Sequence, residues 1–133
     1  MRKIAAKCMN LKYKQLTLNE SLKIIEGNNY CHIALSKNNK PYLLPMNYNI
    51  YKNENDNNGC YFEMMSLRKC KKMEIIEKNN FVNINVEEVV DNCVFSVMCY
   101  GRVINIKPFN DFIIKIIIKI DYISGRVISN NFK

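Results

Sequence analysis

The sequence predicts a mainly β fold: a six-stranded antiparallel barrel with two flanking helices. Three observations support this. Apolar segments of strand length recur along the chain with short polar turns between them, as in small antiparallel barrels. Only two segments have the spacing of apolar residues that favours a helix. With 133 residues, of which 48% are hydrophobic, the chain can bury a core as a single domain over residues 1–133.

The first helix and the hairpin after it have clear local signals. Residues 17–20 (TLNE) form a capping box, whose side chains bond to the free backbone N–H groups at a helix start. Gly27 is placed to end that helix. Residues 30–36 (YCHIALS) predict a strand, and residues 37–40 (KNNK) predict a tight polar turn. Residues 41–51 then predict the second strand of a hairpin.

The middle of the chain alternates strands with one helix. Gly59 leads into a third strand at residues 60–64. Residues 66–79 predict the second helix, because their apolar residues fall at helical spacing. Two strands follow, at residues 81–86 and 94–106.

Two features mark the last strands. Gly101 predicts a bulge or a close backbone approach inside its strand. In the final strand four isoleucines alternate with other residues and form a wholly apolar face: Ile114, Ile116, Ile118 and Ile120. We expect this half-buried strand to end at Ser124 and Gly125.

The most informative segment is residues 41–48, PYLLPMNY. It is an apolar strand with two prolines. Proline supplies no N–H group to a β-ladder, so central strands rarely contain it. The backbone here is therefore irregular or faces something other than a neighbouring strand, such as a flat ligand.

Composition excludes several classes of site. None of the six cysteines forms a C-x-x-C pair and the chain has one histidine, so no metal site is expected. Cysteines within apolar runs are typical of reduced thiols in a cytoplasmic protein. The isoleucine-rich run at residues 112–120 is too short to span a membrane. The net charge of +8 is scattered except for one basic cluster: Arg68, Lys69, Lys71 and Lys72.

Five segments together resemble a known family. They are YCHIAL, PYLLPMNY, YFEMMS, KKMEIIEKNN and SVMCYGRV, in that order. The chain resembles the pyridoxamine 5'-phosphate oxidase-like FMN-binding split barrels, in particular the nitroimidazole-resistance (Nim-type) flavoproteins. The match covers residues 16–106, and residues 117–126 (IIKIDYISGR) resemble the last strand of that group. The resemblance implies a split barrel, the cofactor FMN and a homodimer with FMN in a groove at the interface.

The resemblance also implies cofactor-binding residues. The isoalloxazine ring would be lined by the end of the proline-containing segment: Pro45, Met46, Asn47 and Tyr48. The phosphate would lie at the start of the second helix, where a helix N-terminus and ammonium groups favour a dianion. Two alignments of this loop differ by about two residues; we favour Ser66 and Lys72, with Arg68 and Lys69 next.

The sequence departs from the family pattern in places. Glu63 stands where the branch usually has a histidine, which changes the charge near the active site. Only residues 107–111 stand where the family commonly inserts a helix, so part of the groove is expected to be uncovered. The chain has no tryptophan, and residues 128–133 carry no arginine-rich motif. We therefore do not expect pyridoxamine-phosphate oxidation itself.

The expected function is flavin-dependent electron transfer in the cytoplasm. A reduced nicotinamide or another donor would supply electrons to a small oxidised substrate, such as a nitro-aromatic or a quinone. No side chain is a convincing acid, base or nucleophile, and the lone His32 is expected to be a packed or edge residue. Two alternatives stay open: a flavin-storage module, and a small basic nucleic-acid-binding barrel. The favoured hypothesis has no nucleic-acid or membrane partner.

Overall fold

A computed structural model of the protein describes residues 11–130, so Cys8 lies outside the described part. The elements in chain order are β1 (Leu11–Gln15), α2 (Leu18–Glu26), β2 (Tyr30–Lys37), β3 (Lys40–Asn47), β4 (Asn49–Tyr51), β5 (Cys60–Leu67), α3 (Lys71–Lys78), β6 (Phe81–Val90), β7 (Cys93–Pro108) and β8 (Ile113–Asn130). Neither helix is long or apolar enough to cross a membrane.

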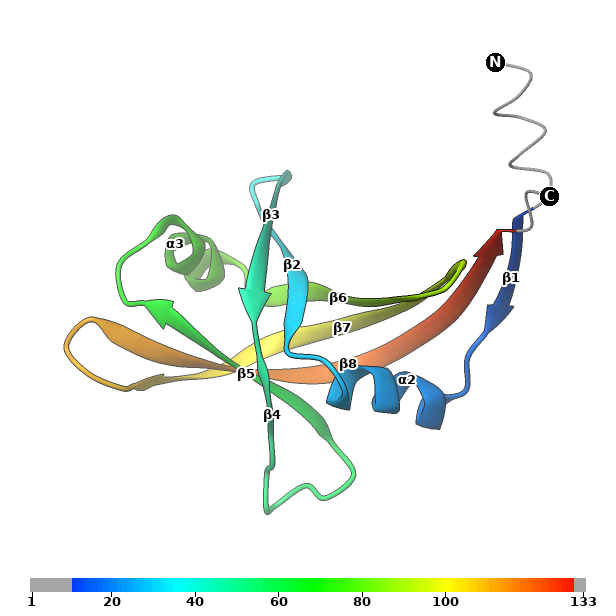
Figure 1. The fold of residues 1–133 in the computed structure, drawn as a ribbon. Helices are drawn as coiled ribbons and strands as arrows, with labels where there is room; N and C mark the ends of the chain where they lie inside the picture. The colour runs from blue at the N-terminus through cyan, green and yellow to red at the C-terminus, as the bar shows by residue number, and fades with distance from the viewer. Residues whose placement is uncertain (1–10, 131–133) are drawn as a thin grey trace.

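The strands form one antiparallel sheet that curls without closing. Their order is β3-β2-β6-β7-β8-β5-β4, and β1 pairs with the C-terminal part of β8. The two ends of this order, β3 and β4, are consecutive in the chain and are separated only by Tyr48. β3 pairs with β2, and β4, which follows directly, pairs with β5. The chain therefore crosses the opening of the barrel between β3 and β4 (Figure 1). The predicted split β-barrel with flanking helices is confirmed, but the described residues form eight strands rather than the six predicted, because β1 and β4 were not expected as separate strands.

The core lies inside the curled sheet. The apolar face of β8 supplies Ile114, Ile116, Ile118 and Ile120, all at most 7% exposed, as its alternation predicted. Phe62 of β5 and Ile84 of β6 are fully buried beside them in the same cluster. Ile25 of α2 and Ile76 of α3 add apolar side chains from the helices. Ile117 is also buried, although its position alternates with the apolar face of β8.

Several local predictions are confirmed. The capping box is present: the Glu20 N–H donates to Thr17 Oγ1 at 3.2 Å, and the Thr17 N–H donates to Glu20 Oε1 at 2.9 Å. The β2–β3 turn is tight, with positive φ angles at Asn38 and Asn39. The ladder between β7 and β8 shifts register between Tyr100 and Gly101, which is the predicted bulge.

Several elements differ from the predictions, and long-range pairing explains most of these differences. The predicted strand at residues 41–51 is two strands that meet at Tyr48. The last strand does not end at Gly125, because β7 and β1 pair with the segment beyond it. For the same reason β1 forms, which local pattern did not predict. The second helix begins at Lys71, because Ser66 stays in the β5–β8 ladder opposite Ile114.

Candidate functional site

A cavity of about 540 Å³ occupies the opening between the end of β3 and β5. We call it the split cavity. Its volume falls within the range of about 300–1,000 Å³ that is usual for small-molecule and cofactor sites. Residues from several elements of the fold line it: Asn29, Pro45, Met46, Asn47, Tyr48, Asn49, Glu63, Met65 and Lys72. The four residues predicted to contact the ring are thus brought together with one residue predicted for the phosphate.

The irregular backbone at Tyr48 shapes this cavity. The Tyr48 N–H donates to the Asn29 carbonyl at 2.9 Å rather than to a strand partner. Its hydroxyl donates to the Ile25 carbonyl at the end of α2 at 2.6 Å, and burial raises the Tyr48 pKa well above its usual range. Its ring packs on Phe62 with centroids 4.7 Å apart. The buried side chain of Tyr48 therefore holds the segment between β3 and β4 against the core. Little of Tyr48 besides its backbone faces the cavity.

The edge of β3 leaves backbone groups available to a ligand. β3 ends the strand order and pairs only with β2 among the described strands. Pro41 and Pro45 are tolerated there because an edge strand does not need every N–H group for a ladder. The other edge of β3 faces the opening. This arrangement matches the prediction that the segment faces something other than a second strand.

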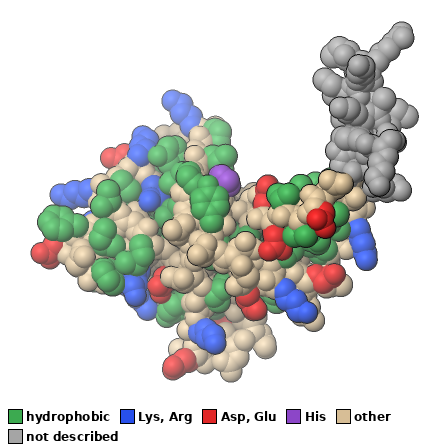
Figure 2. All heavy atoms as spheres, in the orientation of Figure 1, with side chains coloured by type: hydrophobic (Ala, Val, Ile, Leu, Met, Phe, Trp, Pro, Cys, Tyr) green, Lys and Arg blue, Asp and Glu red, His purple; other side chains and the backbone are tan. Residues whose placement is uncertain are grey.

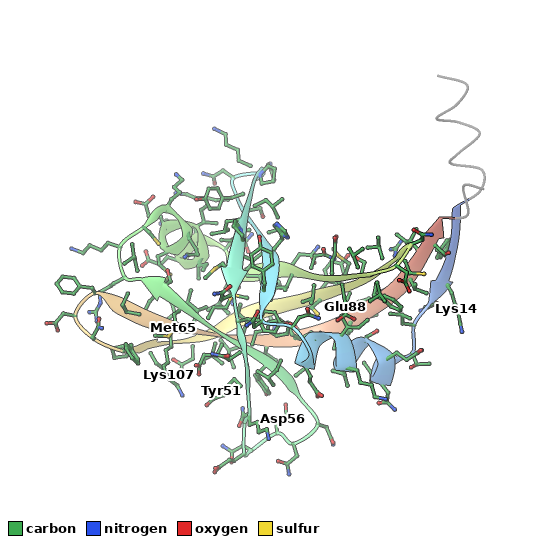
Figure 3. All side chains as sticks on the ribbon, in the orientation of Figure 1. Lys14, Tyr51, Asp56, Met65, Glu88 and Lys107 are labelled. Carbon is green, nitrogen blue, oxygen red and sulfur yellow. The ribbon has the colours of Figure 1, made fainter. Side chains whose placement is uncertain are left out.

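The β5 side of the cavity carries a carboxylate. Glu63 Oε1 lies 3.8 Å from Lys115 Nζ, with the two side chains 21% and 34% exposed. Met65, two residues further on the same face of the strand, is partly exposed (Figure 3). Sequence reasoning singled out Glu63 but missed Met65, which the two-residue alternation of a strand could have revealed. It also missed Asn29 and Asn49, and for Asn29 no local signal was present.

The basic cluster is divided among three places, and Lys71 lies at a hollow beside the β2–β3 turn. Lys72, in the first turn of α3, lines the split cavity. Arg68 and Lys69 instead line a separate cavity of about 320 Å³ beside the β7–β8 loop. Arg68 Nη2 donates to the Asn110 carbonyl at 3.0 Å, which holds that side chain against the loop.

Ser66, near the end of β5, lies under the surface. It is 5% exposed, and its hydroxyl donates to the Leu67 carbonyl at 3.0 Å. It does not line the split cavity. The loop between β7 and β8 is short, as predicted, and leaves Phe109 and Phe112 exposed.

The described thiols are free; Cys31 and Cys99 are buried, and the others are partly buried. Burial raises the pKa of Cys31 and Cys99 to about 12 and that of Cys60 to about 11, so these thiols stay protonated near neutral pH. Cys70 differs: burial raises its pKa, but the Met73 N–H, the Ser66 hydroxyl and the Lys72 charge outweigh burial and lower it overall. No group of metal-binding side chains occurs within residues 11–130.

A second hollow lies on the outer face of the sheet, and we call it the outer groove. It measures about 620 Å³ and is lined by His32, Leu43, Asn85, Glu87, Ser96, Met98, Tyr100, Arg126 and Ile128. Figure 2 shows hydrophobic side chains beside His32, the single histidine of the chain. His32 is exposed there and meets the Tyr30 ring edge-on, with centroids 5.5 Å apart. It does not line the split cavity.

Comparisons with known proteins agree with this fold. Residues 17–110 match the model of the family described as pyridoxamine 5'-phosphate oxidase. An FAD-binding protein from Mesorhizobium loti superposes with a TM-score of 0.75 at 21% identity, covering 90% of this chain and 99% of that chain. A candidate 5-nitroimidazole antibiotic resistance protein from Bacteroides thetaiotaomicron gives 0.71 at 18% identity, covering 90% of both chains.

A third solved structure is similar over most of its length. It is an FAD-binding protein from Mycobacterium smegmatis, with a TM-score of 0.63 at 14% identity, covering 87% of this chain and 98% of that chain. No curated protein matches the sequence. At these identities the solved structures support the fold alone. The family model spans most of the sequence, and on that basis the chain belongs to the pyridoxamine 5'-phosphate oxidase family.

Proposed function

We propose that the protein binds a flavin in the split cavity and uses it to pass electrons to a small oxidised molecule. One observation carries the proposal: the fold joins the proline-containing edge strand β3, the amides around Tyr48 and the ammonium group of Lys72 in a single cavity. A flavin needs a flat surface with backbone or amide partners at its ring and a cation at its phosphate. The cavity offers both.

Each part of the cavity has a distinct task. The edge of β3 and the neighbouring amides, Asn47 and Asn49, present hydrogen-bonding groups to a ring system. Lys72 lies in the first turn of α3, where the helix N-terminus adds its own attraction for a phosphate. Glu63, paired with Lys115, places a negative charge on the opposite wall. The bound flavin would supply the electron-transfer chemistry, and these residues would orient it.

Similar proteins support a flavin and do not specify the substrate. Two of the solved structures are described as FAD-binding proteins and another as an F420 reductase. The relative described as a candidate 5-nitroimidazole resistance protein makes a nitro-aromatic a reasonable electron acceptor to assay. Met65, which is 40% exposed, adds an apolar side chain to the cavity wall against which such a flat molecule could pack.

The proposal is tested with the visible absorption spectrum of the purified protein, followed by titration with FMN and FAD. We expect flavin bands, or tight uptake of about one flavin per chain. Nicotinamide-dependent turnover of a nitro-aromatic would then separate a reductase from a storage module. A colourless protein that takes up no flavin would contradict the proposal, and salt-dependent binding of single-stranded nucleic acid would then favour the alternative barrel.

The protein is further proposed to form a homodimer through the outer groove. The groove exposes large apolar side chains, with Leu43 68% and Tyr100 46% exposed, on a face that would otherwise meet water. It contains both Glu87 and Arg126, which a two-fold axis could bring together between copies.

The dimer proposal predicts that Leu43→Glu produces a monomer at concentrations where the unchanged protein is a dimer. The added charge would be buried without a partner in the interface. Sedimentation equilibrium measures the result. Leu18→Glu is the matched control, because Leu18 is 60% exposed on α2, away from the groove, and its change should leave the dimer intact. A dimer that persists in Leu43→Glu would contradict this interface.

A further inference from the structure

The outer face of the sheet carries a row of three side chains that begins at the split cavity. Met65 of β5 lies directly opposite Lys115 of β8, and Lys115 lies directly opposite Lys107 of β7. Side chains directly opposite each other in an antiparallel pair share one face of the sheet. We call these three residues the cross-strand row. In Figure 3, Met65 and Lys107 lie on the same side of the sheet, with Tyr51 next to Lys107.

Two lysines directly opposite each other are unfavourable in a sheet, because like charges in such a pair repel each other. Lys107 Nζ donates to the Tyr51 hydroxyl at 3.2 Å and lies 5.0 Å from the centre of the Tyr51 ring. No carboxylate lies within ion-pair distance of Lys107 in the described residues. An uncompensated positive charge therefore remains at the far end of the cross-strand row.

The charge of Lys115 is only partly compensated. Its Nζ atom lies 3.8 Å from Glu63 Oε1, which is longer than the roughly 2.8 Å of a charge-assisted hydrogen bond. The same atom lies 5.4 Å from the centre of the Phe109 ring. Together with Lys107, this part of the surface carries two positive charges and one negative charge. An anionic group placed between the two ammonium groups would remove their repulsion and could accept hydrogen bonds from both.

The surface under the cross-strand row is apolar and shielded from water. Ile117 lies on the outer face between Glu63 and Asn105, yet it is 1% exposed and lies outside the core cluster. Longer side chains on this face therefore cover it. Lys107 and Lys115 are themselves only partly exposed, so water and salt screen their charges less than those of fully exposed lysines.

The reach of the row suits a small aromatic ligand. β8 lies between β5 and β7, so Met65 and Lys107 are two strand spacings apart, or about 10 Å. Met65 and Glu63 both line the split cavity, and Lys115 is the ion-pair partner of Glu63. A flat molecule packed against Met65 would therefore have its far end near the two ammonium groups.

We propose that the cross-strand row selects electron acceptors that carry an acidic group, such as an aromatic carboxylate. The inference rests on the proposed function and names the substrate class of the same site. The aromatic ring would lie against Met65 beside the flavin, and the carboxylate would bind between Lys107 and Lys115. Lys115 would exchange its long pair with Glu63 for a direct hydrogen bond to the acceptor. A neutral acceptor of the same shape would lack these contacts.

The test compares 4-nitrobenzoate with 4-nitrobenzamide, which has nearly the same shape but no charge. Their dissociation constants are measured on the full-length protein loaded with FMN, from the change that each compound causes in the flavin absorption spectrum without an electron donor. We expect 4-nitrobenzoate to bind about five- to tenfold more tightly, as for a partly shielded charge pair. This preference should shrink as salt is added.

Four variants locate the preference. Lys107→Gln should abolish it and leave the affinity for 4-nitrobenzamide unchanged. Tyr51→Phe removes the hydrogen bond to Lys107 but keeps its charge, so the preference should remain. Glu63→Gln should increase the preference, because Lys115 then has no competing carboxylate. Lys14→Gln is the matched control: it removes one positive charge at the other end of the molecule (Figure 3), and both affinities should stay unchanged.

The possible results separate this inference from the proposed function. Equal affinities for the two compounds, or a preference that persists in Lys107→Gln, would overturn the inference and leave the flavin site standing. The same holds if neither compound binds to protein that holds flavin. A protein that takes up neither FMN nor FAD would overturn the proposed function, and this inference with it. Flavin uptake by each variant shows that its fold is kept, and the salt and Glu63→Gln results do not depend on Lys107→Gln.

Discussion

Replacing Lys72 by glutamine is expected to weaken flavin binding by about 10- to 100-fold, the usual range for loss of a hydrogen bond to a charged group. Lys72 is the residue of the basic cluster that lines the split cavity, and its side chain is partly shielded from water. Its charge is therefore screened less than that of a fully exposed lysine. Fluorescence titration with FMN measures the change, and circular dichroism checks that the fold is kept.

Lys69→Gln is the matched control for this prediction. Lys69 is three residues away and carries the same charge, but it lines the separate cavity beside the β7–β8 loop. Its change should leave flavin affinity within about twofold, because a distant exposed charge acts weakly. The double variant Lys69→Ala/Lys72→Ala should lose no more affinity than the Lys72 change and should remain a dimer. An equal loss in Lys69→Gln would contradict the assignment of the phosphate to Lys72.

Gly101→Ala is expected to destabilise the protein by about 2 kcal/mol or more, the scale of overpacking in a tight site. A Cβ atom at this position would collide with the carbonyl group of Lys119 on β8. That carbonyl belongs to the backbone of a strand paired on both sides, by β7 and β5, so it cannot move away freely. Urea unfolding followed by circular dichroism measures the free energy of unfolding.

Gly27→Ala provides the comparison for the same substitution. Gly27 ends α2 with a φ of −83°, which alanine also adopts, and its added Cβ atom would lie 3.1 Å from the Lys23 carbonyl oxygen. We expect a change within about 1 kcal/mol there. An unfolding midpoint of Gly101→Ala equal to that of the unchanged protein would show that the β7–β8 ladder adapts at the bulge.

Local sequence signals predicted the elements whose geometry depends on neighbours in the chain. The Thr17–Glu20 capping box, the turn at Asn38 and Asn39 and the bulge at Gly101 all appear as expected. The first two depend on hydrogen bonds or steric limits that a few consecutive residues determine by themselves. The bulge falls at the glycine where β8 approaches too closely for a side chain. The alternation of isoleucines in β8 likewise predicted which face is buried.

Strand ends and the start of α3 could not be predicted in this way. β8 continues past Gly125 because β7 and β1 both pair with it there, and these partners come from distant parts of the chain. α3 begins at Lys71 rather than Ser66 because β5 stays paired with β8 through Leu67. A neighbouring strand can form hydrogen bonds with the same backbone groups that a helix would use. Pairing with β8 therefore keeps Ser66 and Leu67 in a strand, although the apolar residues there have helical spacing.

The sequence by itself determined the class of fold, the irregular segment around Pro45 and Tyr48 and the presence of a basic cluster before the second helix. Only the tertiary structure decided which member of that cluster reaches the split cavity. Lys72 and Lys69 are equivalent in local chemistry, but the helix start at Lys71 directs them to different cavities. The reason is that a side chain's direction depends on where its helix begins, and this in turn depends on how far β5 and β8 pair.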